Sequence, residues 1–185
     1  MSKSSIRKEL LFIRNNLVNK EALSKKINHQ VINFINTIIN KENSKLKIAS
    51  FLSLSNEINT SLINSTFEVY LPIIHPTIKH GLWFAKDIGS YYENKYKIKE
   101  PVYKPTGIVA PWELDIIIVP IVGFTQNKYR MGMGGGFYDY SLSFKKSHKK
   151  PITIGIAFDE QQNNAIIIDN HDIQLDTIIT PTRIL

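Results

Sequence analysis

The sequence predicts an α/β fold in one domain, with an open, mainly parallel β-sheet flanked by helices. Segments with helical spacing of apolar residues alternate with short apolar segments typical of strands. The central strand, Leu114 to Val119, is almost continuously apolar, as expected for a strand covered on both faces. The chain has 185 residues and neither an internal repeat nor an interdomain linker. We therefore expect residues 1–185 to form a single domain.

The first third of the chain predicts three helices and one strand. Apolar residues recur every three or four positions over 3–18 and again over 21–39, which indicates two amphipathic helices. The period then changes, and residues 47–53 are typical of a buried strand. A short helix is expected from Thr60, with Asn59 or Thr60 as its cap.

The rest of the chain predicts strands separated by loops. Pro120 should end the central strand and Gly123 should open a long loop. A helix is expected over about 137–146, after that loop. The segments expected to be strands are 69–74, 82–86, 114–124, 152–159 and 165–169.

Composition limits the possible classes of function. The chain has no cysteine, which excludes disulfides and thiolate chemistry. It has no apolar run of about 18 residues and no apolar stretch near the N-terminus, so we expect a cytoplasmic protein without a membrane partner. The net charge of +7 suits either nucleic acid or a small polyanion such as ATP. Because the lysines are scattered, we expect no nucleic-acid partner.

The most informative stretch is residues 130–140, RMGMGGGFYDY, between a buried strand and a probable helix start. Glycines let the backbone adopt positive φ and approach a ligand, and consecutive N–H groups can bind phosphate oxygens. Arg130 would add a forked donor for phosphate, and Asp139 a hard oxygen ligand for Mg²⁺. Phe137 occupies the position where a dinucleotide-binding motif needs glycine, and no Walker motif occurs. The alternative is a flexible glycine turn with solvated flanking charges.

The stretch R-M-G-M-G-G-G-F-Y-D resembles the signature of the 5-formyltetrahydrofolate cyclo-ligase family. Three further segments fit that family in the same order: Lys3–Arg14, Phe51–Thr60 and His171–Pro181. The resemblance spans nearly the whole chain. It implies a fold similar to that of sugar-phosphate isomerases and CoA transferases.

The resemblance implies an enzyme, a ligase of one-carbon metabolism that forms a C–N bond. ATP and Mg²⁺ would drive ring closure of 5-formyltetrahydrofolate, with or without a polyglutamate tail, to 5,10-methenyltetrahydrofolate, ADP and phosphate. The formyl oxygen would attack the γ-phosphate, N10 would add to the activated carbon, and phosphate would leave. Such catalysis rests on positioning and charge neutralisation. We expect a monomer. The alternatives are a non-catalytic nucleotide or folate sensor on the same fold, and an RNA-binding protein.

The resemblance also implies roles for individual residues. The metal would be held by Asp139, with Asp172 as a second candidate. Arg130 and Tyr138 would be catalytic. ATP would contact Lys3, Arg7, Arg130, Met131, Gly132, Met133, Gly134, Gly135, Gly136, Phe137 and Tyr138. The folate would contact Arg7, Leu52, Glu57, Gly134, Gly135, Gly136 and Phe137.

Without the resemblance, each of these positions could instead have a structural or solvent-exposed role that involves no ligand. Lys3 and Arg7 share a helical face that could simply be solvated. Glu57 could be a surface residue before a helix cap, and Leu52 could belong to the core. Phe137 and Tyr138 could pack at a helix start, and Asp172 could lie in a surface loop.

Three residues depart from the family pattern. Thr125 replaces an Asp, Lys128 replaces a Gly two places before the arginine, and Tyr140 replaces a basic residue after the motif Asp. These changes bear on the geometry of the turn more than on its phosphate contacts.

Overall fold

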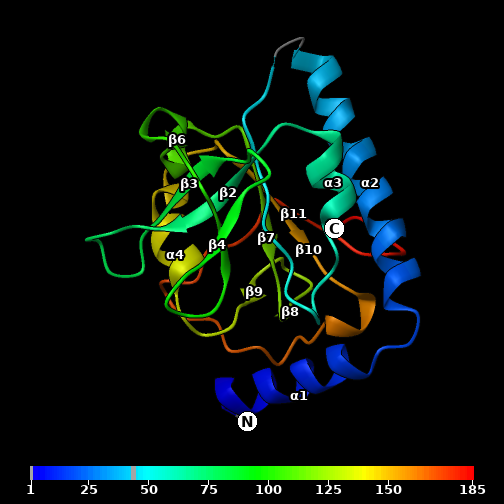
Figure 1. Cartoon of the computed structure of the whole chain (residues 1–185). Helices are drawn as coiled ribbons and strands as arrows, with labels where there is room; N and C mark the ends of the chain where they lie inside the picture. The colour runs from blue at the N-terminus through cyan, green and yellow to red at the C-terminus, as the bar shows by residue number, and fades with distance from the viewer. Residues whose placement is uncertain (1, 43–44) are drawn as a thin grey trace.

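The computed structural model describes residues 2–42 and 45–185 and contains a seven-stranded sheet between two layers of helices (Figure 1). The strand order is β11-β10-β7-β1-β2-β3-β6. Strands β11 through β2 pair in parallel, and β3 and β6 add an antiparallel edge. The predicted α/β class with a mainly parallel sheet is confirmed. The strand bounds are β1 Ile48–Ala49, β2 Val69–Ile74, β3 Leu82–Lys86, β6 Ile108–Val109, β7 Ile116–Pro120, β10 Ile152–Ile156 and β11 Thr177–Ile179.

The helices divide between the two faces of the sheet and one of its ends (Figure 1). Helices α2 (Lys20–Glu42) and α3 (Ser61–Thr66) cover one face, and the short α4 (Phe137–Ser141) lies on the other. Helix α1 (Lys3–Asn16) runs across the lower end, beneath the hairpin of β8 (Gly123–Phe124) and β9 (Arg130–Met131). A second hairpin joins β4 (Tyr91–Glu93) to β5 (Lys99–Pro101). Four 3₁₀ turns complete the described chain: η1 Pro105–Gly107, η2 Pro111–Glu113, η3 Ser143–Lys146 and η4 Asp159–Gln161.

The continuous apolar run of β7 is explained by its central place in the sheet. Ile116 and Ile118 pack in the cluster beneath α2, while Ile117 and Val119 pack in the cluster on the α4 face. Successive side chains of a strand point to opposite faces, so both sets must be apolar when both faces are covered. All four residues are fully buried.

Helix α1 is attached through a third, smaller apolar cluster. Ile6 and Leu10 of the helix pack there against Val122 after β7, Met131 of β9 and Ile166. A Cβ added to Gly123 would collide with the side chain of Leu10, so glycine at this position lets the helix approach the hairpin closely. The helix therefore lies directly over the end of the sheet where β7 stops.

Most predicted elements are confirmed, with shifted bounds for some. The strands over 69–74 and 82–86 have the expected bounds, and α1 ends two residues earlier than expected. The predicted strand over 114–124 is divided, because the chain leaves the sheet after Pro120 and pairs again as β8. The expected helix over 137–146 is likewise divided into α4 and η3.

Two strand predictions need correction. Residues 47–53 contribute only the two residues of β1 to the sheet. Residues 165–169 form no strand: Ile166 is buried against α1, but Ile167 and Ile168 are each 44% exposed. This segment crosses the end of the sheet rather than joining it, and of its apolar run only Ile166 packs against the helix.

None of the helices over the described residues combines the length and the apolar character needed to cross a bilayer.

Candidate active site

The candidate site lies at the carboxyl end of the parallel strands, where ligands bind in open α/β sheets. The loops after β1, β7 and β10 reach this end, and α1 crosses it (Figure 1). It is formed by segments far apart in the sequence.

The backbone of the glycine loop, residues 132–136, is exposed between β9 and α4. Gly134 and Gly136 adopt left-handed conformations, with φ of +96° and +68°. Non-glycine residues rarely adopt such angles, which explains glycine at these two positions. Within the loop Met133 is 56% exposed, whereas Met131 at its start is buried in the cluster beneath α1. Apart from the Met133 side chain, the loop thus presents only backbone to its surroundings.

Helix α1 carries two cations at this end of the sheet, of which Arg7 contacts the glycine loop and Lys3 contacts the segment over 169–172. The Arg7 Nε donates a hydrogen bond of 2.9 Å to the carbonyl of Gly132. A Cβ added to Gly134 would lie 3.4 Å from Arg7 Cζ, so the guanidinium lies against the loop. Lys3, one turn earlier, lies 2.7 Å from a carboxylate oxygen of both Asp169 and Asp172. Burial lowers the pKa of Lys3, but the two carboxylates outweigh burial and raise it overall. Lys3 and Arg7 share one face of α1, as predicted.

Arg130 is buried and pairs with Asp139 across the glycine loop. Its Nη1 lies 2.9 Å from Asp139 Oδ1, and the Arg130 side chain is only 3% exposed. The same Asp139 oxygen accepts a bond from the backbone N–H of Ile173, which also offers its carbonyl to Arg130. The guanidinium stands 5.9 Å from the ring centroid of Tyr138. The two charges that flank the loop in sequence therefore neutralise each other in this structure.

Tyr138 carries a buried hydroxyl without a hydrogen-bond partner among the described residues. Burial raises the pKa of this phenol; the negative charge of Glu57 raises it further, and Arg130 acts in the opposite direction. A buried hydroxyl without a partner is costly, so native proteins rarely retain one without a reason. The charges of Arg130 and Glu57 therefore both act on the Tyr138 phenol, in opposite directions.

Glu57 lies in the loop between β1 and α3, with a side chain 9% exposed. Its Oε2 accepts a bond of 3.0 Å from the backbone N–H of Leu54. Burial raises the pKa of Glu57, while that backbone bond and the positive charge of Arg14 act to lower it. Leu52, five residues earlier, is half-buried against the cluster beneath α2.

Phe137, at the start of α4, is partly buried and meets two other rings. Its ring lies edge-on to His80 at 5.5 Å and to Tyr96 at 6.4 Å between centroids. Tyr96 comes from the turn of the β4–β5 hairpin, which therefore reaches the edge of the glycine loop. Three rings from different segments of the chain therefore cluster beside the candidate site.

Carboxylates near the loop offer oxygen ligands of the kind that Mg²⁺ prefers. Asp169, His171 and Asp172 can bring their ligand atoms within 4.8 Å of one another. Asp139 joins this region through its bond from the N–H of Ile173, the residue after Asp172. Lys3 already bridges Asp169 and Asp172, so a metal ion at Asp172 would have to displace the ammonium.

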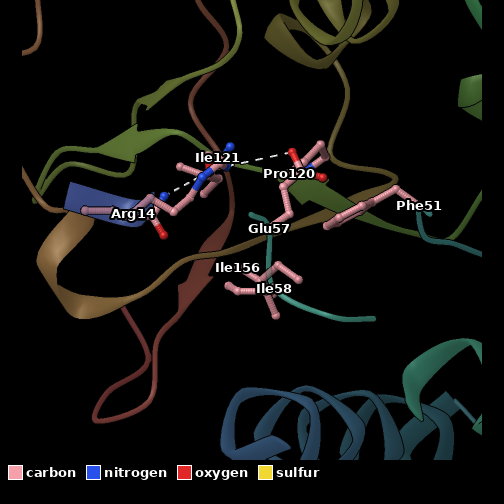
Figure 2. A pocket seen from close by; sticks show the side chains of 8 residues that line it. Arg14, Phe51, Glu57, Ile58, Pro120, Ile121 and Ile156 are labelled. Carbon is pink, nitrogen blue, oxygen red and sulfur yellow. Dashed lines mark hydrogen bonds and ion pairs between the residues drawn. The ribbon is translucent and has the colours of Figure 1, made fainter. Parts of the chain in front are cut away.

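Sequence reasoning missed Arg14, which is 1% exposed at the end of α1. It lies seven residues after Arg7, two helical turns along the same face, and this spacing could have identified it. Its guanidinium donates to the carbonyl of Ile121 at 3.1 Å and lies 3.8 Å from Glu57 Oε1 (Figure 2). It also donates to Asn56 Oδ1 at 3.0 Å.

The departures at Thr125 and Lys128 fall in the turn of the β8–β9 hairpin. Lys128 adopts a left-handed φ of +62°, the conformation in which a glycine would be favoured. The turn is closed by a bond from Lys128 N–H to the Thr125 carbonyl, and Thr125 Oγ1 accepts from the N–H of Tyr129. The third departure, Tyr140, is 53% exposed on α4.

Comparisons with known proteins agree over nearly the whole chain. A sequence model of the 5-formyltetrahydrofolate cyclo-ligase family matches residues 1–181. The chain is 31% identical to the 5-formyltetrahydrofolate cyclo-ligase of Haemophilus influenzae, over 96% of each protein. It is 33% identical to that of Escherichia coli K12, over 74% of this chain and 79% of the relative.

Solved structures agree with these sequence comparisons. The 5,10-methenyltetrahydrofolate synthetase of Aquifex aeolicus resembles the fold with a TM-score of 0.78 at 26% identity, covering 100% of this chain and 92% of that one. The synthetase of Mycoplasma pneumoniae has the same fold, with a TM-score of 0.72 at 24% identity, covering 98% of this chain and 99% of that one. Since sequence and structure agree from end to end, this chain belongs to the 5-formyltetrahydrofolate cyclo-ligase family.

Proposed function

We propose that the chain uses ATP and Mg²⁺ to cyclise 5-formyltetrahydrofolate to 5,10-methenyltetrahydrofolate, with release of ADP and phosphate. Its class as a cyclo-ligase follows from family membership. The nucleotide, the metal and the roles of single residues form the proposal.

One observation carries the nucleotide assignment. The exposed glycine loop has two left-handed glycines, and Arg7 lies against it with its Cζ 3.4 Å from the Cβ position of Gly134. An exposed backbone beside a guanidinium is suited to bind the oxygens of a polyphosphate. Lys3, one turn away on α1, would supply a second positive charge once released from Asp169 and Asp172.

The reaction itself needs charge stabilisation rather than a protein nucleophile. Transfer of the γ-phosphoryl group to the formyl oxygen makes the formyl carbon electrophilic, and attack by N10 closes the ring as phosphate leaves. Arg130, buried beside the loop, would stabilise charge on the transferring group. Glu57 would accept N–H bonds from the aminopyrimidine edge of the folate, and the Tyr138 hydroxyl would gain a partner from the bound substrate.

Asp139 and Asp172 would hold the magnesium ion, since carboxylate oxygens are the donors it prefers. When bound, the ion would neutralise phosphate charge. Both carboxylates pair with a cation in this structure: Asp139 with Arg130, and Asp172 with Lys3. We infer that these carboxylates pass from protein cations to the metal as the protein cations move to phosphate.

Absorbance-monitored turnover of 5-formyltetrahydrofolate, with and without ATP and Mg²⁺, tests the proposal. We expect methenyltetrahydrofolate and ADP in equal amounts, and no product when either ATP or the metal is withheld. ATP hydrolysis at the same rate without folate would contradict it, as would ring closure that needs no nucleotide.

A further inference from the structure

Arg14 is a charged side chain in the interior that no step of the reaction uses. It is 1% exposed and among the largest fully buried side chains in the described chain. It comes from the last turn of α1, whereas Lys3, which pairs with Asp169 and Asp172, and Arg7, which bonds to the glycine loop, come from the first half. Burying a guanidinium costs several kcal/mol unless it is well paired, so its retention needs an explanation.

The contacts of Arg14 all lie on the folate side of the site. One Nη donates to the carbonyl of Ile121, at the end of β7, and the other to Asn56 Oδ1, in the loop that carries Glu57. Asn56 is also held by its side-chain amide, which donates to Asn15 Oδ1 at 2.8 Å. Two successive residues of α1 therefore fix the residue that precedes Glu57.

The pairing of Arg14 with Glu57 is electrostatic rather than a hydrogen bond. Their nearest atoms, Arg14 Nη1 and Glu57 Oε1, are 3.8 Å apart, beyond hydrogen-bond distance. Arg14 Nε has no hydrogen-bond partner among the described residues. Both side chains line a small cavity of about 10 Å³, together with Ile121 and Ile156 (Figure 2). The Glu57 Oε1 thus keeps its capacity to accept bonds while a positive charge stands beside it.

The other groups around Glu57 do not supply this charge. Leu54 contributes one backbone N–H from the same loop, Gln161 lines the cavity as a neutral amide, and Tyr138 from α4 is a neutral phenol. Arg130 is paired with Asp139 and acts on Tyr138. Arg14 is the cation that lies 3.8 Å from Glu57 and whose positive charge acts to lower the Glu57 pKa.

We propose that Arg14 is a positioning residue that keeps Glu57 ionised and oriented to accept hydrogen bonds from the folate. The inference rests on the proposed role of Glu57. A direct bidentate pair would have consumed both carboxylate oxygens, whereas a guanidinium at 3.8 Å leaves Oε1 able to accept. Arg14 acts through Glu57 and touches neither the formyl group nor the phosphates.

Two variants test this idea in the whole enzyme. Arg14→Met removes the charge and keeps much of the buried volume, and Arg14→Lys restores the charge. For Arg14→Met we expect the folate KM to rise about tenfold at the acid end of the pH range and to approach the wild-type value as the pH rises, because Glu57 then ionises without the help of Arg14. The ATP KM and kcat should change less than about twofold, and Arg14→Lys should recover most of the folate affinity.

The matched control is Lys8→Met, which removes an exposed charge from the same helix. It should leave every folate parameter unchanged. A KM rise for ATP and folate alike, independent of pH and accompanied by a lower melting temperature, would show that Arg14 is only a structural anchor and would overturn the proposal.

A readout without substrate separates this inference from the proposed function. The Glu57 carboxyl can be titrated by ¹³C NMR, assigned by comparison with Glu57→Gln. We expect its titration midpoint to move up by about one unit or more in Arg14→Met, a tenfold change in proton affinity. If that variant does not fold, Arg14→Lys and Arg14→Gln give the same comparison. An unchanged midpoint in the variants overturns the proposal for Arg14, whereas a shifted midpoint without any effect on folate affinity would instead remove Glu57 from the folate site.

Discussion

The two halves of the candidate site differ in how completely their charged and polar groups are paired. On the side proposed to bind phosphate, made of Lys3, Arg7, the glycine loop, Arg130 and Asp139, both Lys3 and Arg130 already have carboxylate partners at 2.7–2.9 Å. On the side proposed to bind the folate, made of Arg14, Glu57 and Tyr138, the polar groups are largely buried and incompletely paired.

This contrast indicates what each half must do when its ligand arrives. A polyphosphate brings four or so negative charges, so the phosphate side can only bind it by exchanging partners among cations, carboxylates and metal. A pterin brings neutral donors and acceptors, so the folate side needs fixed groups that lack partners until the ligand supplies them. Substitutions on the phosphate side should therefore alter rate and metal dependence, and those on the folate side affinity.

The largest effect is expected for Arg130→Ala. Loss of a cation that stabilises the transferring phosphoryl group should lower kcat by roughly 10²-fold or more. The matched control is Arg183→Ala, which removes an arginine from a partly exposed ion pair with Asp159 and should leave kcat unchanged. Steady-state kinetics of the folded variants decide the matter. Near-normal kcat in Arg130→Ala would remove this pair from the chemistry and confine its role to stability.

Asp139→Asn sharpens the same comparison, because it keeps the shape beside Arg130 and removes the charge. We expect weaker metal binding, with activity partly restored by excess Mg²⁺. Asp159→Asn, which alters a carboxylate outside the loop, should show no altered metal requirement. A loss of activity in Asp139→Asn that no concentration of Mg²⁺ relieves would favour a purely structural role in holding Arg130.

Glu57→Gln should raise the folate KM about tenfold or more, with little change for ATP. It turns one acceptor into a donor, and a buried mispaired group costs on the order of 1–3 kcal/mol. Glu113→Gln is a suitable control, because Glu113 also accepts from a backbone N–H three residues earlier but lies exposed in η2. An unchanged folate KM in Glu57→Gln would contradict the expectation that substitutions in this half of the site alter folate affinity.

The smallest effect in this group concerns the stability of the same variant. Burial raises the pKa of Glu57, so the folded protein binds this proton more tightly than the unfolded chain does. The ionised carboxylate therefore destabilises the folded protein at pH values above the folded pKa of Glu57. This destabilisation disappears below the pKa of the unfolded chain, near 4.5. Thermal melting should show Glu57→Gln above wild type at neutral pH, with the difference shrinking as pH falls. A difference that does not depend on pH would contradict it.

Lys128→Gly acts outside both halves and should change stability alone. Glycine relieves the left-handed φ of +62°, although the Lys128 Nζ bond to the Asp176 carbonyl is lost. We expect a net gain of about 0.5–1 kcal/mol, measured by denaturant unfolding, with unchanged kinetics. Asn19→Gly, at φ +59°, should gain less, because asparagine tolerates this conformation. Any loss of activity in Lys128→Gly would tie the turn to the site.

The fold was predictable where one physical requirement dominates a segment. The run over 116–119 must be apolar on both faces, and the segment over 69–74 alternates buried and half-buried residues as a strand does. The segment over 165–169 shows the limit of such reasoning. Its isoleucines are consistent with a strand, but the sequence does not say that Ile166 packs against α1 and that the next two isoleucines stay exposed.

The site divides in the same way. The glycine loop stood out because glycine is the residue best suited to left-handed positions, and Arg7 because a helical face is periodic. Pairing could not be predicted: nothing in the sequence indicates that Asp139 neutralises Arg130, or that Lys3 bridges Asp169 and Asp172. These are contacts between segments up to 169 residues apart, which depend on the finished fold. The burial of Arg14 was missed because a basic residue at a helix end is usually solvated.

The attachment of α1 has a consequence for local unfolding. The helix is held by a small cluster of its own, apart from the two large clusters that stabilise the sheet. Elements with few apolar contacts open independently of the rest of a domain. The amides of α1 should therefore exchange with deuterium faster than those of β7 in the free enzyme, and should slow markedly when a nucleotide is bound to Lys3 and Arg7. The amide exchange rate of α1, the helix that carries Lys3 and Arg7, would then report whether a nucleotide is bound.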